Sequence, residues 1–211
     1  MSERCPLVVK IGGGLLRDEG LDGLRRGCSE AIELARERPV LVVPGGGPFA
    51  DAVRAVDAQV GLADDLANAL ALRAMDQLGA MLVALLPGAE VLTRLVAPGE
   101  LGLLVAAPAF EGRPEVPESW EVTSDSLAVL AAGAIGANEA VLLKPVAGVL
   151  PRWPSNEPPL ATLTAGELEA LQRAGGGRVV DAYLPEAMRR TGVSVVVRAP
   201  GRRPGTRITH C

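Results

Sequence analysis

The chain has 211 residues, a length that favours one domain with a core large enough to fold without disulfide or metal staples. Its hydrophobic fraction is 48% but its aromatic fraction only 2%, so the core must be aliphatic, as in the buried parallel strands of an α/β protein. A net charge of −4 and the scarcity of aromatic rings argue against a nucleic-acid-binding protein.

Cysteine spacing and hydropathy bear on where the protein works. Cys5, Cys28 and Cys211 are odd in number and far apart, so neither a disulfide framework nor a zinc site is indicated. The N-terminus enters a predicted strand within a few residues and shows no signal peptide. No apolar run approaches the roughly 20 residues of a membrane span. We expect a cytoplasmic protein with no membrane partner.

Predicted strands and helices alternate along the chain. Two proline-rich stretches, 108–120 and 145–159, are expected to be long loops, residues 91–96 fit either a helix or a strand, and Gly79 is expected to end a helix. In chain order the predicted elements are strand 7–11, helix 21–35, strand 40–43, helix 48–60, helix 64–78, strand 81–86, strand 102–107, helix 124–135, strand 139–143, helix 168–174 (opened by a Thr164–Glu167 capping box), helix 185–191, strand 193–198 and an edge strand at 207–209.

This alternation predicts the fold class. Strands that alternate with helices form a parallel sheet that is covered on both faces. We therefore expect an α/β protein, specifically a three-layer α/β/α sandwich with a mainly parallel central sheet, formed as one domain over residues 1–211.

Two glycine turns that follow predicted strands are the most informative local features. Because glycine has no Cβ, peptide N–H groups there can approach phosphate oxygens closely, and a neighbouring lysine adds a positive charge. This combination indicates phosphoryl transfer, although the P-loop spacing G-x-x-x-x-G-K-[ST] is absent. The turns are Gly12, Gly13 and Gly14 after Lys10, and Gly45, Gly46 and Gly47 before Pro48.

The second turn has an alternative interpretation. Gly45, Gly47 and Ala50 also fit the G-x-G-x-x-A of a dinucleotide-binding site. That motif needs an acidic residue at the end of the following strand. Asp64 and Asp65 have the right distance but lie where a helix is predicted to begin, so the nicotinamide interpretation is disfavoured.

Charged residues at other predicted element ends point to the same edge of the sheet. Asp125 lies in the first turn of a predicted helix. Taken alone, an aspartate at this position is explained by its favourable interaction with the helix dipole. Lys144 follows a strand expected to run parallel to the first. Since ligands bind at the carboxyl ends of strands in open α/β sheets, Lys10, Lys144 and the second glycine turn are expected to converge. The single histidine, His210, lies beside the C-terminus, which argues against a Ser-His-Asp triad.

These segments, in this order, resemble the amino acid kinase family, which includes acetylglutamate, aspartate, uridylate and isopentenyl phosphate kinases. The resemblance covers most of the chain. The segments that carry it are Lys10-Ile11-Gly12-Gly13-Gly14, Val43-Pro44-Gly45-Gly46-Gly47-Pro48-Phe49-Ala50, Thr123-Ser124-Asp125-Ser126, Leu142-Leu143-Lys144-Pro145-Val146-Ala147-Gly148-Val149 and Gly205-Thr206-Arg207-Ile208.

The resemblance implies a kinase that uses ATP, with Mg²⁺ travelling with the nucleotide and no dedicated metal site on the protein. The implied catalytic residues are Lys10, which would neutralise charge on the transferring group, Asp125, which would orient Lys10, and Lys144. The implied nucleotide-binding residues are Gly12, Gly13, Gly14, Ser126, Lys144, Val146 and Gly148, and the implied acceptor-binding residues are Gly45, Gly46, Gly47, Asp51 and Asp76.

One further segment bears on the identity of the acceptor. Ala74-Met75-Asp76 resembles the small kinases of methanofuran biosynthesis, which implies (5-(aminomethyl)furan-3-yl)methyl phosphate or a related one-carbon cofactor precursor. A cationic amine on such an acceptor would need a carboxylate, for which Asp51, Asp76 and Asp181 are candidates.

Two functional alternatives stay open, and one further property is expected. The chain could phosphorylate a carboxylate acceptor. It could also be a non-catalytic nucleotide- or oxyanion-binding protein, because Pro145 and Ala147 stand where close relatives often have aspartates. A homo-oligomer is expected, since the sheet edges need cover.

Overall fold

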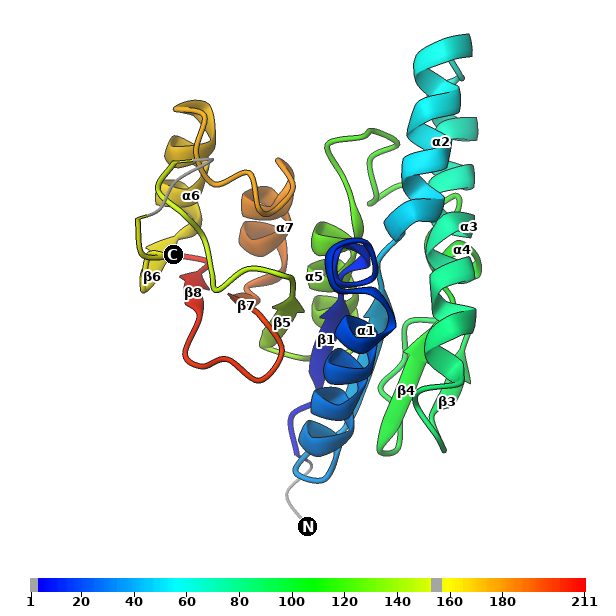
Figure 1. Cartoon of the computed structure of the whole chain (residues 1–211), viewed down its shortest axis with the longest axis vertical. Coiled ribbons are helices and arrows are strands. Elements are labelled where there is room, and N and C mark those ends of the chain that lie inside the picture. Colours follow the sequence, from blue (N-terminus) through cyan, green and yellow to red (C-terminus); the bar gives the residue numbers. More distant parts are fainter. Residues whose placement is uncertain (1–3, 153–156) are drawn as a thin grey trace.

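The strands and helices are described from a computed structural model that describes residues 4–152 and 157–211. The strands are β1 (Leu7–Ile11), β2 (Val40–Pro44), β3 (Glu90–Leu92), β4 (Leu101–Leu104), β5 (Glu139–Leu143), β6 (Thr162–Thr164), β7 (Ser194–Arg198) and β8 (Thr206–Thr209). Within the described ranges they form one sheet in the order β3-β4-β2-β1-β5-β7-β8-β6 (Figure 1). β7 and β8 pair antiparallel, and the other described pairs are parallel.

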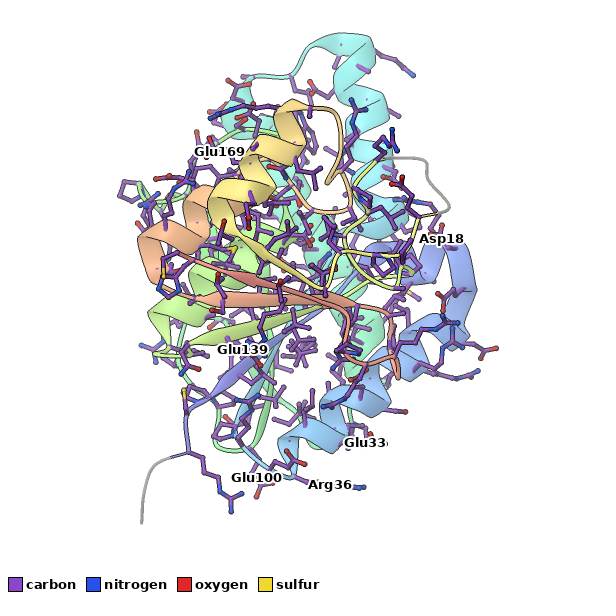
Figure 2. All side chains as sticks on the ribbon, turned by 90° about the vertical axis from the view of Figure 1, so that its left-hand side faces the viewer. Asp18, Glu33, Arg36, Glu100, Glu139 and Glu169 are labelled. Atoms are coloured by element: carbon purple, nitrogen blue, oxygen red, sulfur yellow. The ribbon has the colours of Figure 1, made fainter. Side chains whose placement is uncertain are left out.

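Helices cover both faces of this sheet, which confirms the predicted three-layer α/β fold. The helices are α1 (Gly13–Ala35), α2 (Gly47–Val60), α3 (Asp64–Val83), α4 (Ala106–Phe110), α5 (Ser124–Ala134), α6 (Ala165–Arg173) and α7 (Leu184–Thr191). α1 and the C-terminal half of α3 pack on one face, whereas α4, α5 and α7 pack on the other (Figure 1). Charged side chains at the helix surfaces point outward, as Glu33 and Arg36 do near the end of α1 (Figure 2).

The alternation of side chains along β1 places one charge in the interior. Leu7, Val9 and Ile11 are buried in the core beneath α1, whereas Val8 belongs to the core on the α5 side. Because successive residues of a strand point to opposite faces, Lys10 lies on the same side as Val8. The strand therefore carries a buried lysine to its carboxyl end, directly beneath α5.

The structure corrects the predicted end of α3. The helix continues through Gly79 to Val83, so the helix end at Gly79 and the strand at 81–86 were both wrong. Leu78 and Leu82 continue the buried helical stripe, and this tertiary packing outweighs the low helix propensity of glycine. A Cβ on Gly79 would lie 3.4 Å from the Pro44 ring, so the glycine also lets α3 approach β2 closely.

Further corrections concern shorter segments. The strand predicted at 102–107 ends at Leu104, and the loop predicted at 108–120 begins inside α4 and buries Phe110 and Val116.

The two sides of the sheet also differ from the prediction. Residues 91 and 92 belong to strand β3, and β8 is not an edge strand because β6 pairs on its outer side. The Thr164–Glu167 capping box is present, and residues 153–156 of the predicted loop at 145–159 lie outside the described residues.

Candidate active site

A cavity of about 460 Å³ lies where β1, β2 and β5 end. Its walls come from both glycine turns, the N-terminal turns of α1, α2 and α5, one side of α3, and the segments that precede α5 and α7. This volume falls within the roughly 300–1,000 Å³ of small-molecule sites. The location agrees with the expectation that ligands bind at the carboxyl ends of strands.

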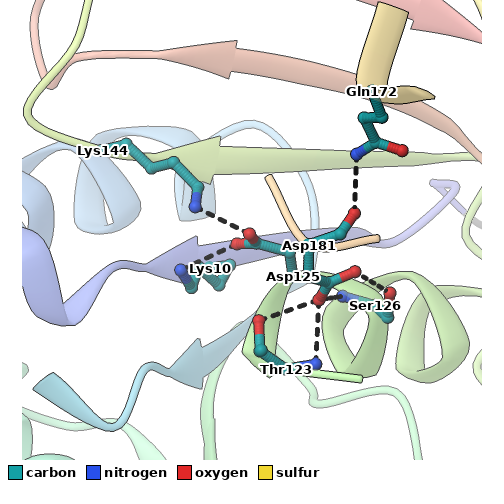
Figure 3. A network of polar contacts seen from close by, with 7 residues as sticks. All are labelled: Lys10, Thr123, Asp125, Ser126, Lys144, Gln172 and Asp181. Carbon is teal, nitrogen blue, oxygen red and sulfur yellow. Dashed lines mark hydrogen bonds and ion pairs between the residues drawn. The ribbon is translucent and has the colours of Figure 1, made fainter. Parts of the chain in front are cut away.

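Asp125, in the first turn of α5, joins the two lysines of the cavity. Lys10 Nζ lies 2.8 Å from Asp125 Oδ1, and Lys144 Nζ donates a hydrogen bond to Asp125 Oδ2 at 2.7 Å (Figure 3). The side chains of Lys10 and Asp125 are 5% and 3% exposed, and that of Lys144 is 14% exposed. One buried carboxylate thus holds two ammonium groups at the floor of the cavity, and the predicted contact between Asp125 and Lys10 is present.

Burial and mutual attraction set the protonation of this cluster. Burial lowers the pKa of Lys10 from 10.5 to about 8, although the charge of Asp125 opposes the shift. Burial would raise the pKa of Asp125, but the charges of Lys10 and Lys144 outweigh it and lower that pKa to about 2. The carboxylate is therefore ionised at neutral pH, and the two ammonium groups that it holds can attract an anionic ligand.

The small number of lysines in the sequence is a further signal of this cluster, which the motifs did not include. Of the 21 lysines and arginines in the chain, Lys10 and Lys144 are the only lysines. An ammonium is a compact charge that fits between a carboxylate and a phosphate oxygen, whereas a guanidinium is a wide planar fork. Arginine thus occupies the other basic positions, and lysine stands at the two positions that contact Asp125.

The two glycine turns touch each other above β1 and β2. A Cβ on Gly13 would lie 2.1 Å from the backbone nitrogen of Gly47, and one on Gly45 would lie 2.6 Å from that of Gly13. A Cβ on Gly12 would lie 2.7 Å from the carbonyl oxygen of Leu143. Since real Cβ contacts are longer than these, larger residues would force the turns apart. Both turns lie at the same edge of the sheet, as predicted.

The cavity includes most of the predicted glycines and excludes some other candidates. The predicted residues that line it are Lys10, Gly12, Gly13, Gly14, Gly46, Gly47, Asp51, Asp125, Lys144, Val146 and Asp181. Gly45 packs against the first turn instead, and Gly148 packs against Thr206. The hydroxyl group of Ser126 donates a hydrogen bond to Asp181, so it is directed to that carboxylate.

Asp76 does not line the cavity. Its carboxylate accepts hydrogen bonds from the backbone nitrogens of Ala106, at 2.5 Å, and Ala107, at 3.3 Å, and so caps the N-terminus of α4. Burial raises the pKa of Asp76, and these two hydrogen bonds oppose the shift. The sequence could not show this role, because the capped helix begins 30 residues further along the chain.

We expect Asp76→Ala to lower the free energy of unfolding by about 1–2 kcal/mol, the usual cost of losing a helix cap. Ligand binding in the cavity should stay unchanged, since Asp76 lies outside it. Urea unfolding and calorimetric titration of the variant would check both expectations. A loss of ligand affinity with unchanged stability would contradict this assignment.

Arginines on α1 and α2 form the outer part of the cavity, and no sequence motif had indicated them. Arg17 Nη2 lies 2.5 Å from Asp51 Oδ2, and Arg54 Nη1 lies 3.1 Å from Asp51 Oδ1. The Arg54 guanidinium also lies 5.0 Å from the centre of the Trp120 ring. Asp51 is thus committed to two arginines, which leaves it less suited to a cationic amine than the sequence suggested. The spacing of Asp51 and Arg54, one helical turn apart, was the available signal.

The donors of the cavity suit a polyphosphate better than a bare metal ion. The cavity offers two ammonium groups, three arginines (Arg17, Arg54 and Arg178) and the backbone of the glycine turns. Within residues 4–152 and 157–211, no three histidine, cysteine, aspartate or glutamate residues are grouped so that they could hold a metal ion. Across the same ranges, no helix has the length and apolar character needed to span a membrane.

The family of the chain follows from comparison with known proteins. The model of the amino acid kinase family matches residues 6–199. The chain belongs to the amino acid kinase family. Over 157 residues, which are 71% of this chain and 70% of the relative, it is 25% identical to the [5-(aminomethyl)furan-3-yl]methyl phosphate kinase of Methanocaldococcus jannaschii.

Solved structures of amino acid kinases share the fold. Uridylate kinase from Archaeoglobus fulgidus superposes with a TM-score of 0.72 at 20% identity, covering 96% of this chain and 99% of that one. Aspartate kinase from Synechocystis superposes with a TM-score of 0.76 at 18% identity, and the match covers 98% of this chain but only 40% of that one. These structures confirm the predicted fold. The family match confirms the predicted family and, with it, the phosphotransferase class of the chain.

Proposed function

We propose that the protein transfers the γ-phosphoryl group of ATP to the phosphate group of a small acceptor, releasing ADP and a diphosphate. The observation that carries this proposal is the Lys10–Asp125–Lys144 cluster, which lies beside two touching glycine turns. Membership in the amino acid kinase family supports the same reaction class. Mg²⁺ would arrive with the nucleotide, since among residues 4–152 and 157–211 no three acidic, histidine or cysteine side chains are grouped to hold it.

The residues of the cluster have distinct roles in this proposal. Lys10 and Lys144 stabilise the negative charge that spreads over the transferring group, and Asp125 fixes where their ammonium groups lie. Gly12, Gly13 and Gly14 present their backbone to the nucleotide phosphates. An oxygen of the acceptor phosphate attacks the γ-phosphorus as the bond to the β-phosphate oxygen breaks, so no covalent enzyme intermediate is needed.

The acceptor side is proposed to take (5-(aminomethyl)furan-3-yl)methyl phosphate or a related precursor of a one-carbon cofactor. Gly46 and Gly47 open α2, whose first turn carries no acidic side chain, so the positive end of the helix dipole there favours an anion. Arg17 and Arg54 add positive charge further out. The relative from Methanocaldococcus jannaschii, which carries that substrate in its name, supports this choice.

An acceptor screen with Mg-ATP tests the proposal. Purified protein is incubated with the furan phosphate, with UMP, and with aspartate or N-acetylglutamate, and ADP release is measured. We expect turnover with a phosphorylated acceptor and none with the carboxylates. Turnover with carboxylates alone would overturn the acceptor class. Mg-ATP binding without turnover on any acceptor would instead favour the non-catalytic alternative.

The pH dependence should report Lys10. Its positive charge is lost as the pH rises through about 8 in the free enzyme, so kcat/KM should fall above that pH. Bound phosphates favour the charged form, so the corresponding fall in kcat should occur at higher pH. In Lys10→Arg, which stays charged, the alkaline fall should disappear although the overall rate is lower. A kcat/KM that stays flat from pH 7 to pH 10 in the parent enzyme would contradict this assignment.

We also propose that the protein is a homo-oligomer. Val56 and Val60 on α2 and Leu66 on α3 expose apolar side chains on neighbouring helices, and a second copy could cover them. Sedimentation should therefore show a species heavier than the 21.8 kDa chain. A single species of the chain mass across micromolar concentrations would refute this proposal.

A further inference from the structure

A distant carboxylate caps the helix that carries Asp125. Asp181 lies in the segment before α7, and its Oδ2 accepts hydrogen bonds from the Thr123 nitrogen (2.9 Å), the Thr123 hydroxyl group (2.8 Å) and the Ser126 nitrogen (3.0 Å). The Ser126 hydroxyl group donates to the other oxygen (Figure 3). Thr123, the residue at the N-cap position of α5, makes no capping hydrogen bond with its own side chain. Asp181 therefore supplies the cap.

This cap fixes the turn in which Asp125 lies. Asp125 falls between Thr123 and Ser126, the two residues that Asp181 holds. The first N–H groups of a helix have no partner within the helix, so the turn would fray without a cap. A displaced turn would carry the Asp125 carboxylate away from its position between the two lysines. The geometry of the cluster thus depends on Asp181, although that residue contacts neither lysine by a hydrogen bond or ion pair in the described residues.

The segment that holds Asp181 also forms a wall of the cavity. Arg178, Val179 and Val180 line the cavity together with Asp181. Gln172, in α6, donates a hydrogen bond to the backbone carbonyl oxygen of Asp181 at 3.0 Å, which fixes the segment from behind (Figure 3). A ligand that touches this wall therefore lies beside the residue that caps α5.

Burying Asp181 close to Asp125 is unfavourable, and the hydrogen bonds that it accepts offset this cost. Burial raises its pKa, as does the nearby charge of Asp125, and the hydrogen bonds from Ser126 and Thr123 oppose the shift. Two buried carboxylates close together repel each other. An uncharged cap such as serine would avoid this repulsion, but its single oxygen could not accept the four hydrogen bonds that the carboxylate accepts.

We propose that Asp181 is the positioning residue of this site: it holds the first turn of α5 so that Asp125 stays between Lys10 and Lys144, and it ties that turn to the wall formed by residues 178–181. The proposal rests on the kinase function for its kinetic readout. Beyond that function, it identifies a residue that acts by positioning Asp125 and does not act on the substrate.

Kinetics of Asp181→Ala and Asp181→Asn test this role, with Asp76→Ala as the matched control. Both aspartates cap a helix from a distance, but Asp76 lies outside the cavity. Measured well below every melting temperature, Asp181→Ala should lower kcat by about 10²-fold with little change in KM, because a small displacement of a catalytic group has that effect. Asp181→Asn, which keeps the shape and an acceptor oxygen, should recover most of the rate. Asp76→Ala should keep the parent rate.

Two kinetic outcomes would overturn the proposal. One is an Asp181→Ala variant that loses stability as Asp76→Ala does but keeps the parent kcat. The other is an Asp181→Asn variant as slow as Asp181→Ala, which would show that the charge of Asp181 acts rather than its hydrogen bonds.

Chemical labelling provides a readout that does not need the kinase reaction. Because Lys10 and Lys144 are the only lysines, an amine-acylating reagent followed by mass spectrometry reports only on them and on the N-terminal amine. At pH 8, Asp181→Ala should raise their acylation rates several-fold, whereas Asp76→Ala should leave the rates unchanged. Equal rates in all three proteins would overturn the positioning role. If no acceptor is ever phosphorylated, the proposed function fails while this experiment still decides the role of Asp181.

Discussion

Replacing Lys10 with methionine is expected to lower kcat and kcat/KM together by about 10²–10³-fold, the usual effect of removing one donor that stabilises transition-state charge. Lys10 Nζ lies at the floor of the cavity, and its charge would act most strongly when negative charge shifts onto the transferring group. Methionine has a similar length and keeps the buried volume. Asp125 would retain Lys144 as its partner, so the fold should survive.

Steady-state kinetics and a urea unfolding curve would check this expectation. Arg207→Met is a suitable control, because it removes a positive charge from a half-exposed side chain outside the cavity. Full turnover in Lys10→Met would show that the assignment of Lys10 is wrong. Loss of folding in Lys10→Met alone would mean that the lysine is needed first for structure.

Replacing Asp125 with asparagine should have the largest effect on stability. The change leaves Lys10 and Lys144 in the interior without a carboxylate, and removing one partner of a buried ion pair costs about 3–5 kcal/mol. Without Asp125, whose charge raises the pKa of Lys10, that pKa should fall below about 8. The rate should fall as well, because neither ammonium group is then held in place.

The sign of the pH effect makes this prediction specific. Between the folded pKa of Lys10 and its unfolded value of 10.5, the unfolded chain binds a proton that the folded chain does not. The stability of Asp125→Asn should therefore rise with pH from 7 to 10 until denaturation by base intervenes. Unfolding curves at pH 7, 8 and 9 would measure this rise. A loss of stability under 1 kcal/mol at pH 7 would contradict the importance of the pair.

The sequence was sufficient to predict the features that depend on nearby residues. The two glycine turns, the strands that lead into them and the position of Asp125 at a helix start are all local patterns, and the topology of a parallel sheet brings them together. The contact between Asp125 and Lys10 followed from the family resemblance and is present in the structure.

Features that depend on distant contacts could not be predicted in the same way. Asp76 and Asp181 each cap a helix that begins 30 or more residues away, so no local pattern distinguishes a cap from a binding carboxylate. The continuation of α3 past Gly79 depends on burial of Leu78 and Leu82 against the sheet and on the close approach to Pro44, which a sequence window does not contain.

The strand order divides the protein at the boundary between β1 and β5. Every described strand up to residue 104 lies on one side of that boundary, and every described strand from residue 139 lies on the other. The cavity spans it, so Lys10 and the glycine turns belong to one stretch of chain and Asp125 and Lys144 to the other. A backbone cut in residues 111–118 would therefore produce two fragments, neither with a complete site, and activity would return only when the fragments associate.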